Sequence, residues 1–264
     1  MAATPTLARP VRYVEHVMGM PISLALRGRH AATADGRAAW AAVMADLAEV
    51  DRVFSTYRPD SVISRLDRGE LELDRAPAVV TEVLELGRQA SEASDGAFST
   101  YLPAEPLDPA GRRRLDPSGV VKGWAAERAS AHLARLADTD YCLSAGGDIT
   151  CRAAPGSEPW RIGIEDPHDP SRVLAVVPLR AGAVATSGTV HRGAHLVDAR
   201  TGRGQQDVAS VTVIGPSLTW ADIDATAAYA RGEGADVWLR TRPIWSALVA
   251  RPDGERITVV PAAS

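Results

Sequence analysis

The sequence predicts an α+β fold with a largely antiparallel sheet and helices grouped on it. Segments with helical periodicity dominate the first half of the chain, whereas short strand-like segments follow one another between residues 141 and 215. Strands in runs favour α+β over a doubly wound fold, in which strands and helices would alternate. The 264 residues, 45% of them apolar, suffice for a substantial core. We expect residues 1–10 to be a disordered N-terminal segment and residues 11–264 to form a single domain.

The first predicted elements are two strands between Val11 and Arg27. The Met18-Gly19-Met20-Pro21 segment separates two apolar runs, so we expect a sharp backbone feature there. Gly19 either forms a β-bulge or lets a ligand approach the backbone, and a bulge is the simpler reading.

Two helices follow in the first half of the chain. Thr33 is a suitable N-cap for a helix that runs to about Phe54, with an apolar stripe at helical spacing. The next helix is predicted over Val79–Ala93 and ends at Ser94-Asp95-Gly96. Tyr57 lies in the polar loop between them, where it either stacks on a planar ligand or covers the edge of the core.

The second half of the chain alternates short apolar segments with turn residues. The Gly146-Gly147 pair fits either a hairpin turn or a wall pressed against a ligand. The predicted elements are, in order, strands at Tyr141–Leu143, Ile149–Cys151, Trp160–Ile164, Val173–Leu179, Val184–Gly188, His195–Asp198 and Ala209–Gly215, helices at Leu218–Ala230 and near Asp236, and strands at Trp245–Leu248 and Ile257–Val260.

The segment from Asp116 to Ala125 runs from a turn directly into a third helix. The Asp-Pro-Ser-Gly sequence is typical of a turn. The residues that follow place an apolar stripe on one side of a helix, and Glu127, Arg128 and Arg135 are expected to face water. Lys122 is predicted in the first helical turn, where a cation is misplaced unless the helix start binds an anion. The alternative is a solvated lysine, which this stretch alone favours because the pattern is not a P-loop.

Composition excludes several functional classes. The net charge of −4 gives no electrostatic case for nucleic acid, and Arg112-Arg113-Arg114 is more simply an exposed loop. Cys142 and Cys151 are expected to be small buried thiols. The chain shows no apolar signal region and no stretch of membrane-spanning length, so we expect a soluble cytoplasmic protein without membrane insertion.

Two further sets of residues could carry chemistry. Asp222 and Thr226 are four residues apart on a predicted helix, so a carboxylate and a hydroxyl of the kind that Mg²⁺ prefers share one face. The alternative is an acid that stabilises the helix start beside an ordinary helical threonine. His195 either acts as a general base near neutral pH or is a buried histidine bound to a carbonyl.

Ordered motifs make the sequence recognisable as a whole. They are Phe54-Ser-Thr-Tyr57, Ser61-Val-Ile-Ser64-Arg65-Leu66, Gly96-Ala97-Phe98, Asp116-Pro-Ser-Gly119-Val-Val-Lys122-Gly123-Trp124-Ala125, Ala145-Gly146-Gly147-Asp148, Trp160-Arg-Ile-Gly-Ile164, Ala185-Thr-Ser187-Gly188, His195-Leu-Val-Asp198-Ala-Arg-Thr201-Gly202 and Ala221-Asp222 with Ala225-Thr226-Ala227. In this order, from about Met18 to beyond Ala230, the chain resembles the ApbE family of FAD:protein FMN transferases. The resemblance implies an ApbE-like, T-fold-related architecture.

The resemblance also implies a Mg²⁺-dependent enzyme. Such an enzyme cleaves the pyrophosphate of FAD, attaches FMN through a phosphoester bond to a Ser or Thr of an acceptor protein, and releases AMP. By position, the implied metal ligands are Asp222, Thr226 and the main chain of Gly119, and His195 matches the proposed base. The implied FAD contacts are Met18, Tyr57, Ala97, Phe98, Ser99, Asp116, Lys122 and the backbone at Leu196.

The sequence departs from the family pattern at three places: Met20 in place of Thr, Ser99 in place of Asp, and Ala199 in place of Pro. Ser99 removes a carboxylate from the implied FAD pocket. Two other functions therefore stay open beside flavin transfer: Mg²⁺-dependent hydrolysis of FAD to FMN and AMP, and flavin binding without chemistry.

Overall fold

The computed structural model describes residues 9–103, 111–188 and 197–261. Its centre is an eight-stranded sheet in which every neighbouring pair is antiparallel, in the order β1-β2-β5-β6-β9-β10-β11-β12. The strands are β1 (Val11–Val17), β2 (Met20–Gly28), β5 (Thr139–Ala145), β6 (Asp148–Arg152), β9 (Ala181–Gly188), β10 (Ser210–Gly215), β11 (Ser246–Ala250) and β12 (Arg256–Val259). The predicted α+β class with a largely antiparallel sheet is confirmed.

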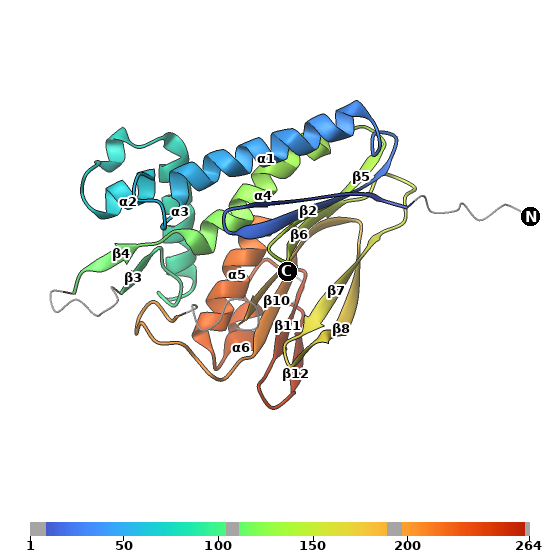
Figure 1. The fold of residues 1–264 in the computed structure, drawn as a ribbon. Helices are drawn as coiled ribbons and strands as arrows, with labels where there is room; N and C mark the ends of the chain where they lie inside the picture. The colour runs from blue at the N-terminus through green and yellow to red at the C-terminus, as the bar shows by residue number, and fades with distance from the viewer. Residues whose placement is uncertain (1–8, 104–110, 189–196, 262–264) are drawn as a thin grey trace, which may run out of the picture.

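Helices cover one face of this sheet (Figure 1). Those on the sheet are α1 (Ala34–Phe54), α4 (Ser118–Ala134), α5 (Leu218–Arg231) and α6 (Ala235–Leu239). The helices α2 (Val62–Asp67) and α3 (Ala78–Ala93) pack mainly on these helices, with a short 3₁₀ turn at Leu73–Arg75 between them. The Thr33 hydroxyl accepts a hydrogen bond from the N–H of Gly36 and so caps α1 as predicted. The main core lies between these helices and the sheet, where apolar side chains of α1, α4 and α5 pack on β2, β5, β9 and β10.

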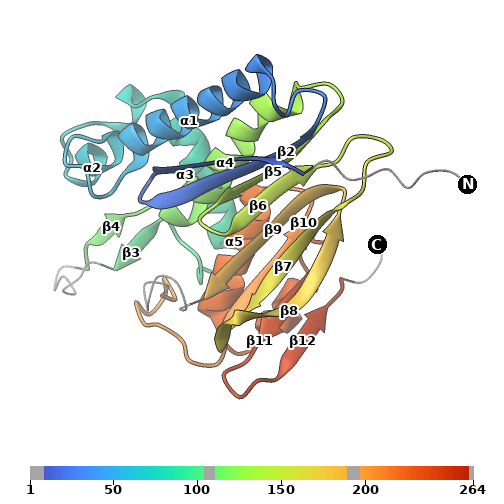
Figure 2. The same ribbon diagram turned by 45° about the vertical axis from the view of Figure 1, so that its right-hand side comes forward.

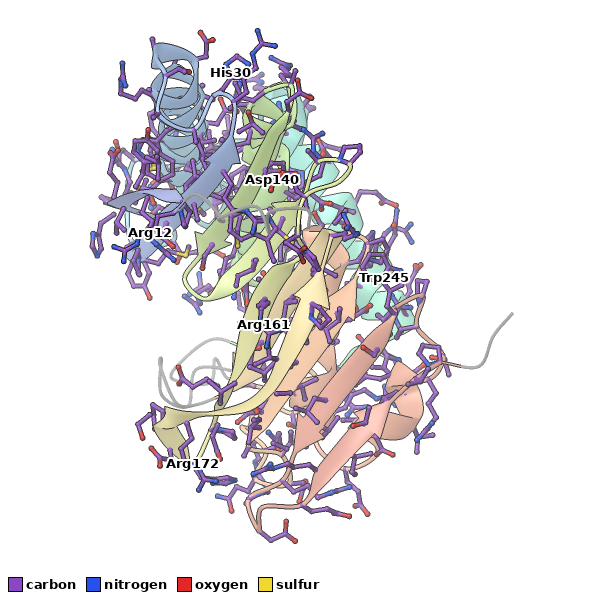
Figure 3. The ribbon with its side chains drawn as sticks, turned by 90° about the vertical axis from the view of Figure 1, so that its right-hand side faces the viewer. Arg12, His30, Asp140, Arg161, Arg172 and Trp245 are labelled. Carbon is purple, nitrogen blue, oxygen red and sulfur yellow. The ribbon has the colours of Figure 1, made fainter. Side chains whose placement is uncertain are left out.

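A separate hairpin covers part of the opposite face of the sheet (Figure 2). It consists of β7 (Trp160–Asp166) and β8 (Asp169–Leu179). Trp160, Ile162 and Leu179 point inward and are buried against Cys151 and Val184 of the sheet. Figure 3 shows the hairpin from outside, where Arg161 and Arg172 face solvent. The alternation of buried and exposed residues along β7 is that of a strand with one face on a core.

Several local predictions need correction. Gly19 is not in a bulge: Val17 pairs directly with Met20, and Met18 and Gly19 form a two-residue hairpin turn with φ of 56° and 68°. Positive φ at both central residues is the geometry of a type I′ turn, which matches the twist of the flanking strands. The Gly146-Gly147 pair, by contrast, forms the hairpin turn that was one of its two predicted roles, with φ of 58° and 103°.

Part of the arginine run, which the sequence predicts as an exposed loop, lies in a short strand. β3 (Tyr101–Pro103) pairs with β4 (Arg113–Leu115) in a small antiparallel sheet. Arg113 stabilises this sheet by donating to the carbonyl of Tyr101 over 2.9 Å. The arginine run therefore belongs partly to a strand, because the pairing of its backbone outweighs its polar composition.

The strand predicted at His195–Asp198 lies largely outside the described residues. Within the described part, Asp198 forms an isolated bridge with Arg203. Cys142 and Cys151 are free thiols that pair across β5 and β6; Cys151 is buried as predicted, whereas Cys142 is half-buried. No helix in the described ranges has the length and apolar character needed to cross a membrane.

Candidate active site

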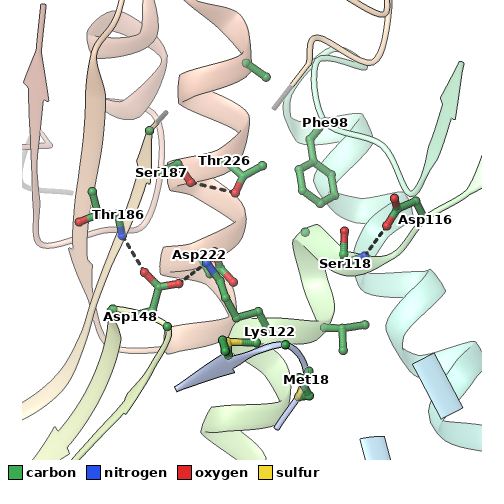
Figure 4. Close-up of a pocket in the computed structure, with 18 of the residues that line it drawn as sticks. Met18, Phe98, Asp116, Ser118, Lys122, Asp148, Thr186, Ser187, Asp222 and Thr226 are labelled. Carbon is green, nitrogen blue, oxygen red and sulfur yellow. Dashed lines mark hydrogen bonds and ion pairs between the residues drawn. The ribbon is translucent and has the colours of Figure 1, made fainter. Parts of the chain in front are cut away.

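One large pocket opens between the helical layer, the hairpin turns and β7. Its volume is about 1070 Å³. Ten of the residues that the sequence proposes for the site line it: Met18, Tyr57, Ala97, Phe98, Ser99, Asp116, Gly119, Lys122, Asp222 and Thr226. The other two, His195 and Leu196, lie outside the described residues. Residues far apart in the sequence thus converge on one cavity (Figure 4).

Two residues of the pocket lining stand out, Met18 for its backbone conformation and Tyr57 for its exposed side chain. Met18 adopts a positive φ of 56°, which non-glycine residues rarely do, and which persists only where the surrounding structure requires it. Tyr57 is 96% exposed. It therefore does not cover the edge of the core, and its ring remains accessible to a planar ligand.

The segment from Ala97 to Ser99 forms a second wall. The hydroxyl of Ser94 accepts a hydrogen bond from the N–H of Phe98 over 3.0 Å and fixes this turn. The Phe98 ring packs so closely on Gly119 that a Cβ there would lie 2.8 Å from it, so glycine is needed at the start of α4. The Ser99 hydroxyl accepts from the N–H of Tyr101 over 3.0 Å, so Ser99 stabilises its own turn.

Asp116 fixes the entry of the chain into α4. Its Oδ1 accepts from the N–H of Ser118 over 3.1 Å, as its turn chemistry predicts, and its Oδ2 pairs with Arg114 over 2.9 Å. Arg114 also lines the pocket. A second basic side chain therefore lies at the cavity, which the reading of residues 112–114 as an exposed loop missed.

Lys122 lies deeper in the pocket than the sequence predicts. It is the fifth residue of α4, just beyond the first turn, and its side chain is only 16% exposed. Its ammonium forms ion pairs with Asp148 of β6 and with Oδ1 of Asp222 on α5, the latter over 3.2 Å. The reading of Lys122 as a solvated helical residue is therefore wrong.

Asp222 is a buried carboxylate whose two oxygens have different partners. While Oδ1 pairs with Lys122, Oδ2 accepts from the backbone N–H of Gly123 over 2.9 Å. Burial raises the pKa of Asp222 to about 7; the charge of Lys122 opposes this rise and that of Asp148 adds to it. One turn further along α5, the hydroxyl of Thr226 contacts that of Ser187 over 3.0 Å.

The donors at this end of the pocket suit a hard divalent cation. Asp222 supplies a carboxylate, Thr226 a hydroxyl and Gly119 a carbonyl, and Gly119 lies close to the Thr226 side chain. Across the described ranges no group of three His, Cys, Asp or Glu side chains is arranged to hold a metal. Mg²⁺ needs no such cage, because it keeps waters or phosphate oxygens beside one or two carboxylates. The residues present therefore fit Mg²⁺.

Three contributors to the site were not assigned from the sequence. Asp148 and Ser187 lie in motifs that were recognised without a role, and only the three-dimensional pairing shows what they contact. Glu127 was predicted to face water, yet its carboxylate accepts hydrogen bonds from Ser217 and Thr219 at the start of α5. Helical periodicity could not reveal this contact, because the partners lie about 90 residues away.

Comparison with known proteins agrees with this arrangement. The sequence profile of the ApbE family matches residues 18–104 and 104–248, which is most of the chain. The chain belongs to the ApbE family. This confirms the resemblance that the ordered motifs indicate.

Curated ApbE relatives match part of the chain. A FAD:protein FMN transferase of Rhodobacter capsulatus is 36% identical over 129 residues, covering 46% of this chain and 24% of the relative. One of Escherichia coli K12 is 36% identical over 123 residues, covering 41% and 34%. One of Treponema pallidum is 34% identical over 161 residues, covering 53% and 44%. The matches thus span between 24% and 44% of the length of these relatives.

Solved ApbE structures match nearly the whole chain. The ApbE protein of Thermotoga maritima superposes with a TM-score of 0.81 at 20% identity, covering 95% of this chain and 97% of that one. The apo flavinyl transferase ApbE of Pseudomonas stutzeri gives 0.80 at 23% identity, covering 98% and 96%. At these identities the likeness establishes the ApbE fold.

Proposed function

We propose that this protein transfers FMN from FAD to a Ser or Thr hydroxyl of an acceptor protein, in a Mg²⁺-dependent reaction that releases AMP. The names of the curated relatives support flavin transfer to a protein. The observation that carries the proposal is the pairing of Lys122 with Asp222 on the wall of a pocket of about 1070 Å³, with the Thr226 hydroxyl one turn away. A lysine, a buried carboxylate and a hydroxyl together suit a pyrophosphate and its cation.

The reaction that we propose replaces the phosphoanhydride bond of the FAD pyrophosphate by a phosphoester bond to the acceptor. The acceptor oxygen forms a bond to the FMN phosphorus while the bridging P–O bond of FAD breaks, and AMP takes the bond's electron pair. Phosphoryl transfer depends mainly on positioning and on neutralising charge, so no protein nucleophile is required. A bound Mg²⁺ would supply positive charge at the phosphate oxygens.

Different residues of the pocket would bind the cation, the phosphates and the rings of FAD. Asp222, Thr226 and the Gly119 carbonyl would hold the cation, while the Lys122 ammonium would contact phosphate oxygens. Tyr57 and Phe98 offer aromatic surfaces for the planar rings of FAD, with Met18, Ala97 and Ser99 beside them. These contacts would fix the pyrophosphate relative to the incoming hydroxyl.

His195 is our proposed general base, assigned by its position in the family motif alone. It would take the proton that the acceptor hydroxyl loses as the new bond forms, a contribution of about 10²–10⁴-fold in rate. The backbone at Leu196 is proposed to contact FAD on the same ground.

The test is to incubate the purified protein with FAD and Mg²⁺, with and without a candidate acceptor domain, and to follow AMP and the acceptor mass together. Flavin transfer predicts AMP only in the presence of acceptor, and an acceptor that gains the mass of one FMN phosphoester. AMP with free FMN in both arms would replace transfer by hydrolysis, and bound FAD without AMP would replace it by flavin binding.

A further inference from the structure

Lys122 lies between two buried carboxylates that come from different elements. Asp148 begins β6 and Asp222 lies on α5, and the side chain of each is only 2% exposed. Figure 4 shows the lysine reaching between them from α4. A single ammonium cannot neutralise two carboxylates, and burying an uncompensated charge is costly. When both carboxylates are ionised, the cluster therefore carries one negative charge that Lys122 does not neutralise.

The two carboxylates differ in what else they bind. Asp222 belongs to the donor set that suits a divalent cation, together with Thr226 on the next turn of α5. Asp148 is held by a different element, because its Oδ1 accepts from the backbone N–H of Thr186 on β9 over 2.9 Å. Apart from the Lys122 ion pair, its Oδ2 meets no hydrogen-bond partner in the described part of the chain. Asp148 is thus fixed with one oxygen directed at Lys122.

We infer that Lys122 is the resident counter-ion of Asp222 and that Asp148 is a positioning residue that retains this lysine when a divalent cation takes Asp222. This inference rests on the metal site of the proposed function. Without Asp148, Lys122 would keep its ion pair with Asp222 and would compete with the cation for it. With Asp148, the ammonium stays paired and remains beside the pocket.

The inference predicts a specific coupling in the binding of a metal alone. Mn²⁺ titrations, followed by the electron paramagnetic resonance of the free ion, would compare the wild type with Lys122→Met, Asp148→Asn and the double variant. Lys122→Met should bind Mn²⁺ about tenfold tighter or more, because a competing cation has gone. Asp148→Asn alone should weaken Mn²⁺ binding by about tenfold relative to the wild type. The double variant should bind only about threefold more weakly than Lys122→Met, because the competing lysine is already absent.

Asparagine matches aspartate in size and keeps an oxygen for the N–H of Thr186, so this change mainly removes charge. Circular dichroism would verify folding, and Asp148→Ser would replace an Asn variant that did not fold. The inference would be overturned if Asp148→Asn weakened Mn²⁺ binding equally in the wild type and in Lys122→Met. Unchanged or weaker Mn²⁺ binding by Lys122→Met would also overturn it, as would a lack of Mn²⁺ binding by every variant. Because no FAD or acceptor is present, a failure of flavin transfer with this coupling intact would count only against the proposed reaction.

Discussion

The backbone N–H of Gly123 donates a hydrogen bond to the Asp222 carboxylate over 2.9 Å, directly between α4 and α5. In a regular α-helix this N–H binds the carbonyl four residues earlier, which here is that of Gly119. One contact between two helices thereby holds Asp222, one of the three proposed metal donors, beside the helix that carries Gly119.

This contact makes Gly123 sensitive to the addition of a single methyl group. A Cβ at Gly123 would lie 2.8 Å from the Cβ of Asp222 and 2.8 Å from the carbonyl oxygen of Leu218. We expect Gly123→Ala to lower the free energy of unfolding by about 1–3 kcal/mol, because the helices must separate. Urea denaturation measures this change. Gly215→Ala is the matched control, since its nearest contact is at 4.0 Å, and equal stabilities of the two variants would contradict the prediction.

Glu127 should stabilise the start of the helix that carries Asp222. Its Oε2 accepts from the hydroxyl of Ser217 over 2.8 Å and from the N–H and hydroxyl of Thr219. We expect Glu127→Ala to cost about 1–3 kcal/mol in unfolding free energy, because these buried donors lose their acceptor. Thermal and urea denaturation would measure it against Glu233→Ala, an exposed glutamate near the far end of α5. A loss no larger than that of the control would argue against the capping role.

The two thiols should react slowly in the folded protein. Burial raises the pKa of Cys142 from 9.0 to about 11 and that of Cys151 to about 12. At pH 8 a rise of this size cuts the reactive thiolate fraction by about 100-fold or more. A disulfide reagent should therefore modify both thiols quickly in guanidinium and slowly in buffer, and rapid modification of the native protein would contradict the assignment.

The same shifts give a pH dependence of stability with a definite sign. Because the thiols lose their protons more readily in the unfolded chain, the free energy of unfolding should fall as the pH rises from about 9 towards the folded values of about 11 and 12. Replacing both cysteines by alanine should flatten this part of the stability profile. Urea midpoints between pH 8 and pH 10 would measure the change, and identical slopes in the two proteins would contradict it.

The sequence predicts elements whose own pattern is strong. The capped helix ending at Phe54 and the strands of the central sheet follow from periodicity and turn residues that act locally. β3 and β4 were missed because each spans three residues, too short for a period, and pairs across an intervening segment. Gly19 was misassigned because a bulge and a type I′ turn both call for glycine.

The candidate site was likewise predicted where local motifs suffice and missed where residues from distant segments meet. The resemblance to the ApbE family, which the ordered motifs carry, implies ten site residues that do line the pocket. The pairing of Lys122 with Asp148 and Asp222 depends on how α4, β6 and α5 meet, which no local pattern encodes. The prediction that Lys122 is a solvated helical residue was wrong for this reason. The prediction that Glu127 faces water was wrong for the same reason. Charged residues with distant partners are the ones that single-segment patterns describe poorly.

The most direct test of the central claim is AMP release from FAD by the Asp222→Ala variant. Asp222→Ala removes the buried carboxylate of the proposed cation site, whereas Asp74→Ala removes an exposed carboxylate that is not part of the pocket lining. With FAD, Mg²⁺ and acceptor, we expect AMP release to be lost in Asp222→Ala, kept in Asp74→Ala, and abolished in the wild type by a chelator. Unchanged AMP release by Asp222→Ala would contradict the proposed metal site and the function built on it.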